Sequence, residues 1–323
     1  MHRTSTWILL LSLTGLLACA STDPVRAETM RQAQMASDMG HHRRAAALWY
    51  GLYRGDAQGR ASLTRPTAEA FLQSGDPGSA LSVVRNGRRL GATGPRLAHI
   101  AAQARAQLGD YEDAVSEIRT ALADDPDQGE WWGSLAHWLW RTDDQVHAYE
   151  ALQRAFELGQ DGPDLQLLMA RALTARGMDT AAFDAWRTLL QQPVGDPNSV
   201  REAARLAVRP TLALDRPDAL ALGVQWFERA VAAEPQDLEI QRELAHAAWL
   251  SGDADKALAA FERASELAPT DQSLLSDLAT LHLSNGGHER ARSLLQRALE
   301  LETDPELVSE WQRRIDAITE QAQ

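Results

Sequence analysis

The stretch Asp237–Thr270, DLEIQRELAHAAWLSGDADKALAAFERASELAPT, decides the fold. Its apolar residues recur at the three- and four-residue spacing of amphipathic helices on both sides of Gly252-Asp253. Glycine can end the first helix, aspartate can cap the second, and Pro269 stops the second helix. Neither helix can bury its apolar stripe alone, so the hairpin predicts further hairpins stacked against it.

The same pattern returns along the chain at a period of 34 residues. Small residues take most of the positions at the turn and where two helices would cross. The residues at these positions are Gly75, Ala80; Gly109, Ala114, Ala121; Asp143, Ala148, Ala155; Gly177, Ala182, Leu189; Gly252, Ala257, Ala264; Gly286, Ala291, Ala298. Alanine at a crossing lets two backbones approach closely. The composition, rich in Ala, Leu, Arg and Glu with few β-branched residues, also favours an all-α protein.

These residues resemble the tetratricopeptide repeat (TPR) family, whose pattern has a bulky residue at position 4, Leu-Ala or Leu-Gly at 7 and 8, Gly-Asp-Tyr at 15–17, alanines at 20 and 27, and proline at 32. The best-matching residues are Gly109-Asp110-Tyr111, Ala114, Ala121, Pro126, Trp132, Leu135, Ala136, Ala148 and Ala155. The resemblance covers nearly the whole chain after about residue 24. It implies a right-handed α-solenoid of about eight TPR-like helix hairpins with a C-terminal capping helix, and it says little about function.

The register of the 34-residue repeat divides the chain into blocks. We expect a first block of five units over 24–196, an irregular unit or bend over 197–237, a second block over 238–305, and a capping helix over 306–323. The interval from Leu189 to Ala230 is 41 residues, not 34. A capping box at Ser199–Glu202 is expected to open a helix that Pro210 ends.

The final helix reads as amphipathic, and its apolar stripe would cover the last open face of the stack. The residues expected to face inward are Leu307, Trp311, Ile315 and Ile318.

The first 18 residues have the layout of a signal peptide, with a basic start and a short apolar run. Leu16-Leu17-Ala18-Cys19 resembles a bacterial lipobox, which implies lipidation of Cys19, the single cysteine of the chain. By resemblance to enterobacterial lipoproteins, Ala20 implies the outer membrane, on the periplasmic side of a Gram-negative envelope. Ala18-Cys19-Ala20 also fits ordinary secretion, with cleavage after Ala20 and a soluble periplasmic product.

A tether over 19–23 would join the lipid to the first helix, which Asp23 can cap with Pro24 at its first position. Five extended residues reach only about 15–18 Å, so we expect the first hairpin close to the membrane. There Arg26, Arg31, Arg43 and Arg44 would meet anionic headgroups, or they would simply be solvated.

Charge is uneven along the chain, whose formal net charge is −13. Residues 20–94 contain 10 arginines and 6 acidic residues, whereas residues 95–323 contain 21 basic and 39 acidic residues. The acidic part argues against nucleic acid as a partner. A solvated surface that keeps a long solenoid soluble explains the same charge.

No catalytic motif is present: HExxH, GxSxG, a P-loop and a strand-linked GxGxxG are all missing from the sequence. His41 and His42 are adjacent and have no further ligand at metal spacing. We therefore expect no enzyme activity, no metal and no cofactor.

In TPR proteins, positions 2, 5, 9, 12 and 13 of each first helix line a concave, peptide-binding groove. This resemblance implies eleven groove residues here: Arg96, His99, Glu130, His137, Trp140, Arg141, Arg171, Glu239, Arg242, His246 and Trp249. The pair His-x-x-Trp occurs twice among them, and aromatic residues with arginine are favoured where peptides bind. Trp140 and Trp249 could equally be half-buried packing residues, and Trp131 and Trp138 are expected to pack. The family's carboxylate-clamp pattern is missing, since Lys256 is the single lysine.

The sequence thus predicts a non-enzymatic scaffold for protein or peptide partners in the envelope. A signal peptide, lipobox, short tether and TPR array resemble pilus-assembly lipoproteins of the type IV pilotin and tight-adherence (Flp) kinds, which implies a role in pilus or secretin assembly. The alternative is an adaptor for envelope enzymes that act on peptidoglycan or exported polysaccharide.

Overall fold

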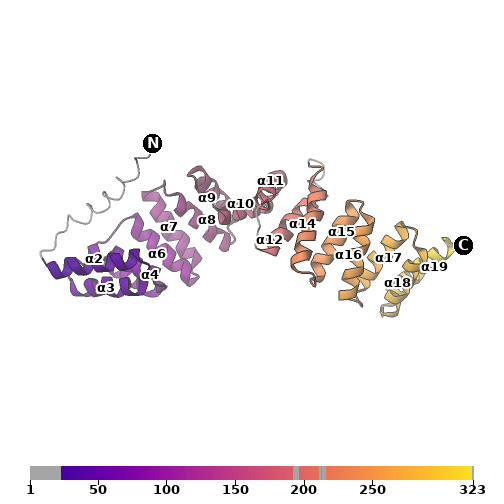
Figure 1. Ribbon diagram of the computed structural model, residues 1–323, viewed down its shortest axis with the longest axis horizontal. Coiled ribbons are helices and arrows are strands. Elements are labelled where there is room, and N and C mark those ends of the chain that lie inside the picture. The colour runs from indigo at the N-terminus through magenta and orange to yellow at the C-terminus, as the bar shows by residue number, and fades with distance from the viewer. Residues whose placement is uncertain (1–22, 192–195, 211, 213–215, 322–323) are drawn as a thin grey trace. The chain divides into compact units, whose positions relative to one another are not determined.

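The computed structural model describes residues 23–191, 196–210, 212 and 216–321, and every helix or strand among them is an α-helix (Figure 1). The predicted all-α solenoid of paired helices is confirmed. The predicted signal peptide, Cys19 and most of the tether lie outside the described residues. The helices form two compact units, with the division between Asp161 and Gly162. The expected block boundaries near 196 and 237 stay predictions.

Among its described residues, the first unit contains four helix hairpins. Their helices are α2 (Pro24–Asp38) and α3 (His42–Gly55), α4 (Arg60–Gln73) and α5 (Pro77–Arg89), α6 (Pro95–Leu108) and α7 (Tyr111–Asp124), and α8 (Gly129–Arg141) and α9 (Gln145–Glu157). The second helix of each hairpin packs on the first helix of the next: α3 on α4, α5 on α6, and α7 on α8. The first helices α4 and α6 also contact each other, which places one side of each in a shared surface.

Short polar signals start and stop these helices. Asp23 and Asp76 cap α2 and α5 by accepting hydrogen bonds from the backbone N–H groups of Val25 and Ser79, and a proline occupies the first helical position in both. The expected cap at Asp23 is therefore confirmed. The turns inside the hairpins use a left-handed residue, which is glycine in most of them.

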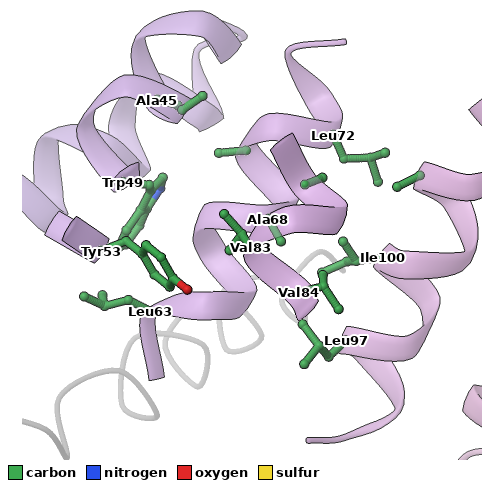
Figure 2. Packing of buried hydrophobic residues seen from close by; sticks show 14 of the residues in the cluster. Ala45, Trp49, Tyr53, Leu63, Ala68, Leu72, Val83, Val84, Leu97 and Ile100 are labelled. Carbon is green, nitrogen blue, oxygen red and sulfur yellow. The ribbon is translucent and has the colours of Figure 1, made fainter. Parts of the chain in front are cut away.

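Large apolar side chains fill the space between the hairpins (Figure 2). Trp49 and Tyr53 of α3 point toward α4 and α5, where Leu63 and Val83 join the same buried cluster. Alanines stand where the two helices of a hairpin cross: Ala80, Ala114 and Ala148 all have no solvent-exposed area. The small residues of the repeat thus set the close approach of the helices, and the large residues set the spacing between hairpins.

In the part that the structure describes, the second unit contains four hairpins and a final helix. Its helices are α10 (Pro163–Ala175) and α11 (Asp179–Leu189), α12 (Pro197–Ala207) and α14 (Ala219–Ala233), α15 (Leu238–Leu250) and α16 (Ala254–Leu267), α17 (Gln272–Ser284) and α18 (His288–Glu300), and α19 (Pro305–Gln321). The stretch Asp237–Thr270 forms the expected hairpin: Gly252 has a φ of 80°, and Asp253 accepts a hydrogen bond from the backbone N–H of Lys256.

The start of the irregular hairpin differs from the sequence-based expectation. Asp196, not Ser199, caps α12, because Asp196 accepts a hydrogen bond from the backbone N–H of Asn198 and Pro197 takes the first helical position. Ser199 is fully buried inside the first turn, and its hydroxyl donates to Asp196 at 2.8 Å. The helix ends at Ala207, before Pro210.

The final helix α19 covers the end of the second unit as expected. Ile315 and Ile318 are buried against Ala291 and Leu295 of α18, and Trp311 is partly buried there. Leu307 was expected to face inward but is 43% exposed. The reason is its position in the opening turn of α19, since the contact with α17 and α18 begins one turn later, at Trp311.

Asp143 occupies the hairpin turn at which most other hairpins have glycine, with a φ of 61° that disfavours any side chain. We expect Asp143→Gly to stabilise the first unit by about 0.5–1 kcal/mol, because relief of the left-handed strain exceeds the added chain entropy. The measurement is the midpoint of urea unfolding, followed by circular dichroism. Gly177→Asp, the reverse change in the next hairpin, should lower the midpoint, and a lower midpoint for Asp143→Gly would contradict the assignment.

Candidate functional site

The first helices of three successive hairpins in the first unit, α4, α6 and α8, line an open groove of about 950 Å³. Most of its lining side chains are polar or charged. The lining residues are Arg65, Glu69, Leu72 and Gln73 of α4, Arg96, His99, Ile100, Gln103, Ala106 and Gln107 of α6, Tyr111 of α7, and His137, Trp138 and Arg141 of α8. We call this surface the first-unit groove.

Three arginines give the groove a positive charge. Arg65, Arg96 and Arg141 are exposed, and within the described residues none of them has a carboxylate oxygen within 4 Å. The groove contains one acidic side chain, Glu69. Its cations are therefore available to a ligand rather than neutralised by the protein.

Aromatic rings hold two of these arginines in place. The guanidinium of Arg96 lies 5.8 Å from the ring centroid of Trp131, and that of Arg141 lies 5.1 Å from the ring centroid of Tyr111. The contact is a cation–π attraction that limits the motion of a long side chain without consuming its hydrogen-bond donors. Trp131 itself is 1% exposed, so it supports the groove from beneath.

His99 stacks on the same tryptophan, with ring centroids 4.9 Å apart and an angle of 24° between the planes. Burial, together with the positive charge of Arg96, lowers the pKa of His99 to about 4. The imidazole is therefore neutral near pH 7, with one nitrogen able to donate and the other able to accept a hydrogen bond.

The structure brings together four of the eleven predicted groove residues: Arg96, His99, His137 and Arg141. The two other predictions from this part of the chain lie elsewhere on α8. Glu130 is exposed and Trp140 is half-buried, and neither lines the groove. The tryptophan that does line it is Trp138.

Of the two neighbouring tryptophans at the start of α8, Trp131 packs as expected and Trp132 departs from the family pattern. Trp131 is almost fully buried, whereas Trp132, at the position that the family packs inside, is half-buried and donates its indole N–H to the carbonyl of Pro126 at 2.8 Å.

The predicted groove positions of the second unit have a different character, because they bind neighbouring helices. Arg171 of α10 pairs with Glu202 of α12 at 2.7 Å and with Asp196 at 3.8 Å. On the next hairpin, Arg201 and Arg205 share Glu243, at 2.6 Å and 2.5 Å. These arginines are neutralised within the chain.

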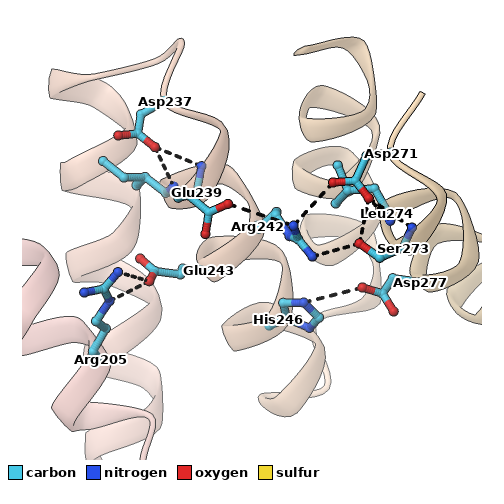
Figure 3. A network of polar contacts seen from close by, with 11 residues as sticks. Arg205, Asp237, Glu239, Arg242, Glu243, His246, Asp271, Ser273, Leu274 and Asp277 are labelled. Carbon is cyan, nitrogen blue, oxygen red and sulfur yellow. Dashed lines mark hydrogen bonds and ion pairs between the residues drawn. The ribbon is translucent and has the colours of Figure 1, made fainter. Parts of the chain in front are cut away.

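The same holds for α15, as Figure 3 shows. Arg242 lies 3.4 Å from Asp271, which caps the next helix, and donates to the hydroxyl of Ser273 at 3.0 Å. His246 lies 3.6 Å from Asp277 of α17. Glu239 is exposed beside Arg242, at 3.9 Å.

The last hairpin is covered in part by the chain itself. Arg314 of the final helix donates to the hydroxyls of Ser276 and Thr280 on α17, at 2.9 Å and 3.3 Å. Trp249 is 39% exposed on α15. The second unit thus offers one exposed tryptophan among positions whose polar groups are engaged with other parts of the chain.

Sequence reasoning missed Arg65, Glu69, Gln73, Gln103 and Gln107, although the repeat register contains them. The 34-residue period places Arg65 in line with His99, Glu69 in line with Gln103 and His137, and Gln73 in line with Gln107 and Arg141. The period does not show at which of these repeat positions an arginine lacks an ion-pair partner, since that depends on the carboxylates of the neighbouring helices.

Two classes of site are not found in the described part of the chain. No group of three or more His, Cys, Asp or Glu side chains there is placed to hold a metal ion. No described helix has both the length and the apolar character needed to cross a bilayer.

Tetratricopeptide repeat family models match three segments of the chain. One model matches residues 248–310, and a second matches residues 101–163 and 221–272. These segments include the part of α6 after residue 100 and all of α7–α9, which carry half of the residues that line the first-unit groove, and α15–α18. No curated protein sequence matches the chain.

Solved structures of similar shape support the same repeat architecture. The C-terminal part of a TPR repeat-containing protein from Cytophaga hutchinsonii has a TM-score of 0.55 and 13% identity, over 76% of this chain and 98% of that one. A structure described as a functional characterisation of pilF from Pseudomonas aeruginosa has a TM-score of 0.52 and 17% identity, over 68% of this chain and 97% of that one. At these identities the likeness concerns the fold alone.

The lowered pKa of His99 predicts a dependence of stability on pH. The unfolded histidine has a pKa of about 6.5, so as the pH falls from about 6.5 toward 4 the unfolded chain gains a proton that the folded chain does not. The contribution of His99 to the stability of the first unit is therefore complete above pH 6.5 and falls across this window.

The measurement is urea unfolding of the wild type and of His99→Gln at several pH values, with the pKa of His99 followed by NMR. We expect the variant to lose less stability than the wild type across the window. Parallel curves and an NMR pKa close to 6.5 would contradict the assignment.

Proposed function

We propose that this chain, with its tetratricopeptide repeats, is a non-enzymatic scaffold that binds an extended, acidic segment of a partner protein in the first-unit groove. Such repeats generally act as protein-interaction modules. The observation that carries the proposal is the set of Arg65, Arg96 and Arg141, which line one groove and have no carboxylate partner among the described residues.

The chemistry of the groove suits a peptide with carboxylate side chains. A guanidinium can bind a carboxylate through two parallel hydrogen bonds, and such charge-assisted bonds are stronger than neutral ones. Gln73, Gln103 and Gln107 add amide groups that can bond to the backbone of an extended segment. Because these residues come from three successive hairpins, the ligand must cross several helices rather than enter one closed pocket.

The second unit is the weaker candidate for the same ligand. An acidic segment would have to compete there with Glu202, Glu243 and Asp271 for arginines that these carboxylates already hold. Breaking such a pair leaves a charge without its partner, which costs free energy that a new contact must first offset.

For the location, we propose that Cys19 is lipidated and that the scaffold is held on the periplasmic side of the outer membrane. The support is the lipobox-like Leu16–Cys19 after an apolar run. The alternative is cleavage after Ala20, with a soluble periplasmic product. The experiment on Cys19 below distinguishes this alternative from lipidation.

For the partner, we propose a component of a pilus or secretin machine. The support is the order of signal peptide, lipobox, short tether and TPR array, which resembles pilus-assembly lipoproteins; the likeness to the pilF structure adds agreement in fold. A peptidoglycan or exopolysaccharide enzyme remains the alternative partner, and the capture experiment below identifies which class is bound.

The groove predicts a loss of partner binding when its charge is reversed. We expect Arg65→Glu/Arg96→Glu/Arg141→Glu to weaken capture of the envelope partner by about tenfold or more, because attraction of the carboxylates becomes repulsion. The measurement is affinity capture from solubilised envelopes with the wild type and the variant, with identification of the bound proteins by mass spectrometry.

The matched control is Arg85→Glu/Arg89→Glu/Arg119→Glu, which changes three exposed arginines of the same unit outside the groove. It carries the same change in net charge and should retain the partner. Equal losses from both variants, or retention by the groove variant with an unchanged circular dichroism spectrum, would contradict the proposal. Pilus components among the proteins lost would support the machine, and wall enzymes would support the adaptor.

The lipid anchor is tested separately. We expect Cys19→Ser to leave the helical content unchanged and to move the protein from the membrane fraction to the soluble periplasmic fraction, because it removes the only thiol of the chain. The measurement is fractionation in high salt with mass analysis of the N-terminal peptide. A wild-type protein that is soluble and begins after Ala20 would contradict lipidation.

A further inference from the structure

A second groove lies in the first hairpin of the first unit, between α2 and α3. It has a volume of about 740 Å³ and is lined largely by small and apolar residues, among them Val25, Ala47, Leu48, Gly51, Leu52 and Gly55. Trp49 and Tyr53 of α3 point the other way, into the core shared with α4 and α5 (Figure 2). We call this surface the end groove, because within the described residues no helix precedes α2.

The first described hairpin and the last hairpin differ in how their outer apolar faces are covered. At the C-terminal end, α19 packs Trp311, Ile315 and Ile318 onto α17 and α18. At the N-terminal end, Val25 is 72% exposed and Met35 is 59% exposed. Val25 lines the end groove together with Leu48 and Leu52 of α3, whereas Met35 lies outside it. Exposed apolar side chains that gather on one face mark a contact surface.

Free positive charge accompanies this apolar surface. Arg43 and Arg44 open α3, are exposed, and have no carboxylate oxygen within 4 Å among the described residues. Arg44 follows the same face as Leu48, Gly51 and Gly55, at helical spacing. Arg26 and Arg31 differ from Arg43 and Arg44, because they pair with Asp56 and Glu28, each at 2.5 Å.

The start of the chain limits what can cover this surface. Asp23 lines the end groove, and the residues from Cys19 to Asp23 span at most about 15–18 Å. An anchor at Cys19 therefore keeps the end groove within that distance of the lipid headgroups, where an apolar surface beside free arginines matches the chemistry of the bilayer interface.

We propose that the end groove is a membrane-docking surface, on which Val25 and Leu48 contact the interfacial region of the bilayer and Arg43 and Arg44 contact lipid phosphates. The inference rests on the proposed lipid anchor at Cys19. Its consequence is a fixed orientation: the first hairpin lies on the membrane, and the rest of the first unit, with its groove, projects from it.

The test uses a fluorescent probe on the lipid-anchored protein. Cys19 is the only cysteine, so once it is acylated an introduced cysteine is the single free thiol. Gly51→Cys places a nitrobenzoxadiazole probe in the end groove at a position where a Cβ atom meets nothing within 4 Å. Gln34→Cys is the matched control, because Gln34 is exposed and lies nine residues, or two and a half turns, from Val25 on the opposite face of α2.

Both proteins are reconstituted in vesicles of phosphatidylethanolamine and anionic phosphatidylglycerol that carry a spin-labelled lipid quencher. We expect quenching at residue 51 to exceed quenching at residue 34 several-fold, and Arg43→Glu/Arg44→Glu to reduce the difference. Equal weak quenching at both positions would overturn the proposal. The proposal would also be overturned if the probe at residue 51 were shielded from water without being quenched, and only at high protein density. A second copy of the chain would then cover the groove.

Mass analysis of the purified protein separates failure of this proposal from failure of the anchor. If Cys19 carries no acyl group, the anchor proposal fails. A chain that begins at residue 20 and carries a histidine tag in place of Cys19 is then held on the same vesicles by a nickel-chelating lipid, with the probe cysteine as its only thiol. Strong quenching at residue 51 would then still support the docking surface, and weak quenching would overturn it.

Discussion

The close crossing of the two helices in each hairpin is the constraint on which the rest of the structure depends. Ala80, Ala114, Ala148, Ala182, Ala257 and Ala291 recur at one position of the repeat, and each is fully buried. A larger side chain there would separate the helices and uncover the apolar stripes that the neighbouring hairpins bury. In the irregular hairpin Gly223 takes this position, and a Cβ atom on it would lie 2.9 Å from Val208. The stack therefore continues through the hairpin whose connections are least regular.

With this common backbone arrangement, the two units use the arginines at their predicted groove positions in opposite ways. In the second unit, arginines of the first helices reach the carboxylates of the next hairpin and hold neighbouring helices together, as Arg242 does with Asp271. In the first unit, Arg65, Arg96 and Arg141 have no such carboxylate among the described residues, and aromatic rings hold two of them in a common groove. The same fold thus provides an internally satisfied stack and a positively charged surface ready for a ligand.

The sequence predicted most of the fold, because the period, the turn glycines and the helix caps are local signals that each hairpin repeats. It failed where a local signal had a competitor, as at Ser199, where Asp196-Pro197 starts the helix first. For the candidate site, the repeat positions led to Arg96, His99, His137 and Arg141, but the choice between Trp138 and Trp140 depends on how α8 rotates against α6. Whether an arginine has an ion-pair partner depends on carboxylates that are far away in the sequence, as Glu243 is from Arg201. No local sequence pattern shows which distant carboxylate will lie beside a given arginine.

The most direct test of the central claim, that the first-unit groove and not the second unit holds the partner, is photocrosslinking in intact cells. A photoreactive amino acid at Gln103, on the groove, is compared with one at His246, which has the same position in its own hairpin. The account predicts a crosslink from position 103 to an acidic segment of an envelope protein, with little product from position 246. A crosslink from position 246 alone, or equal products from both positions, would contradict it.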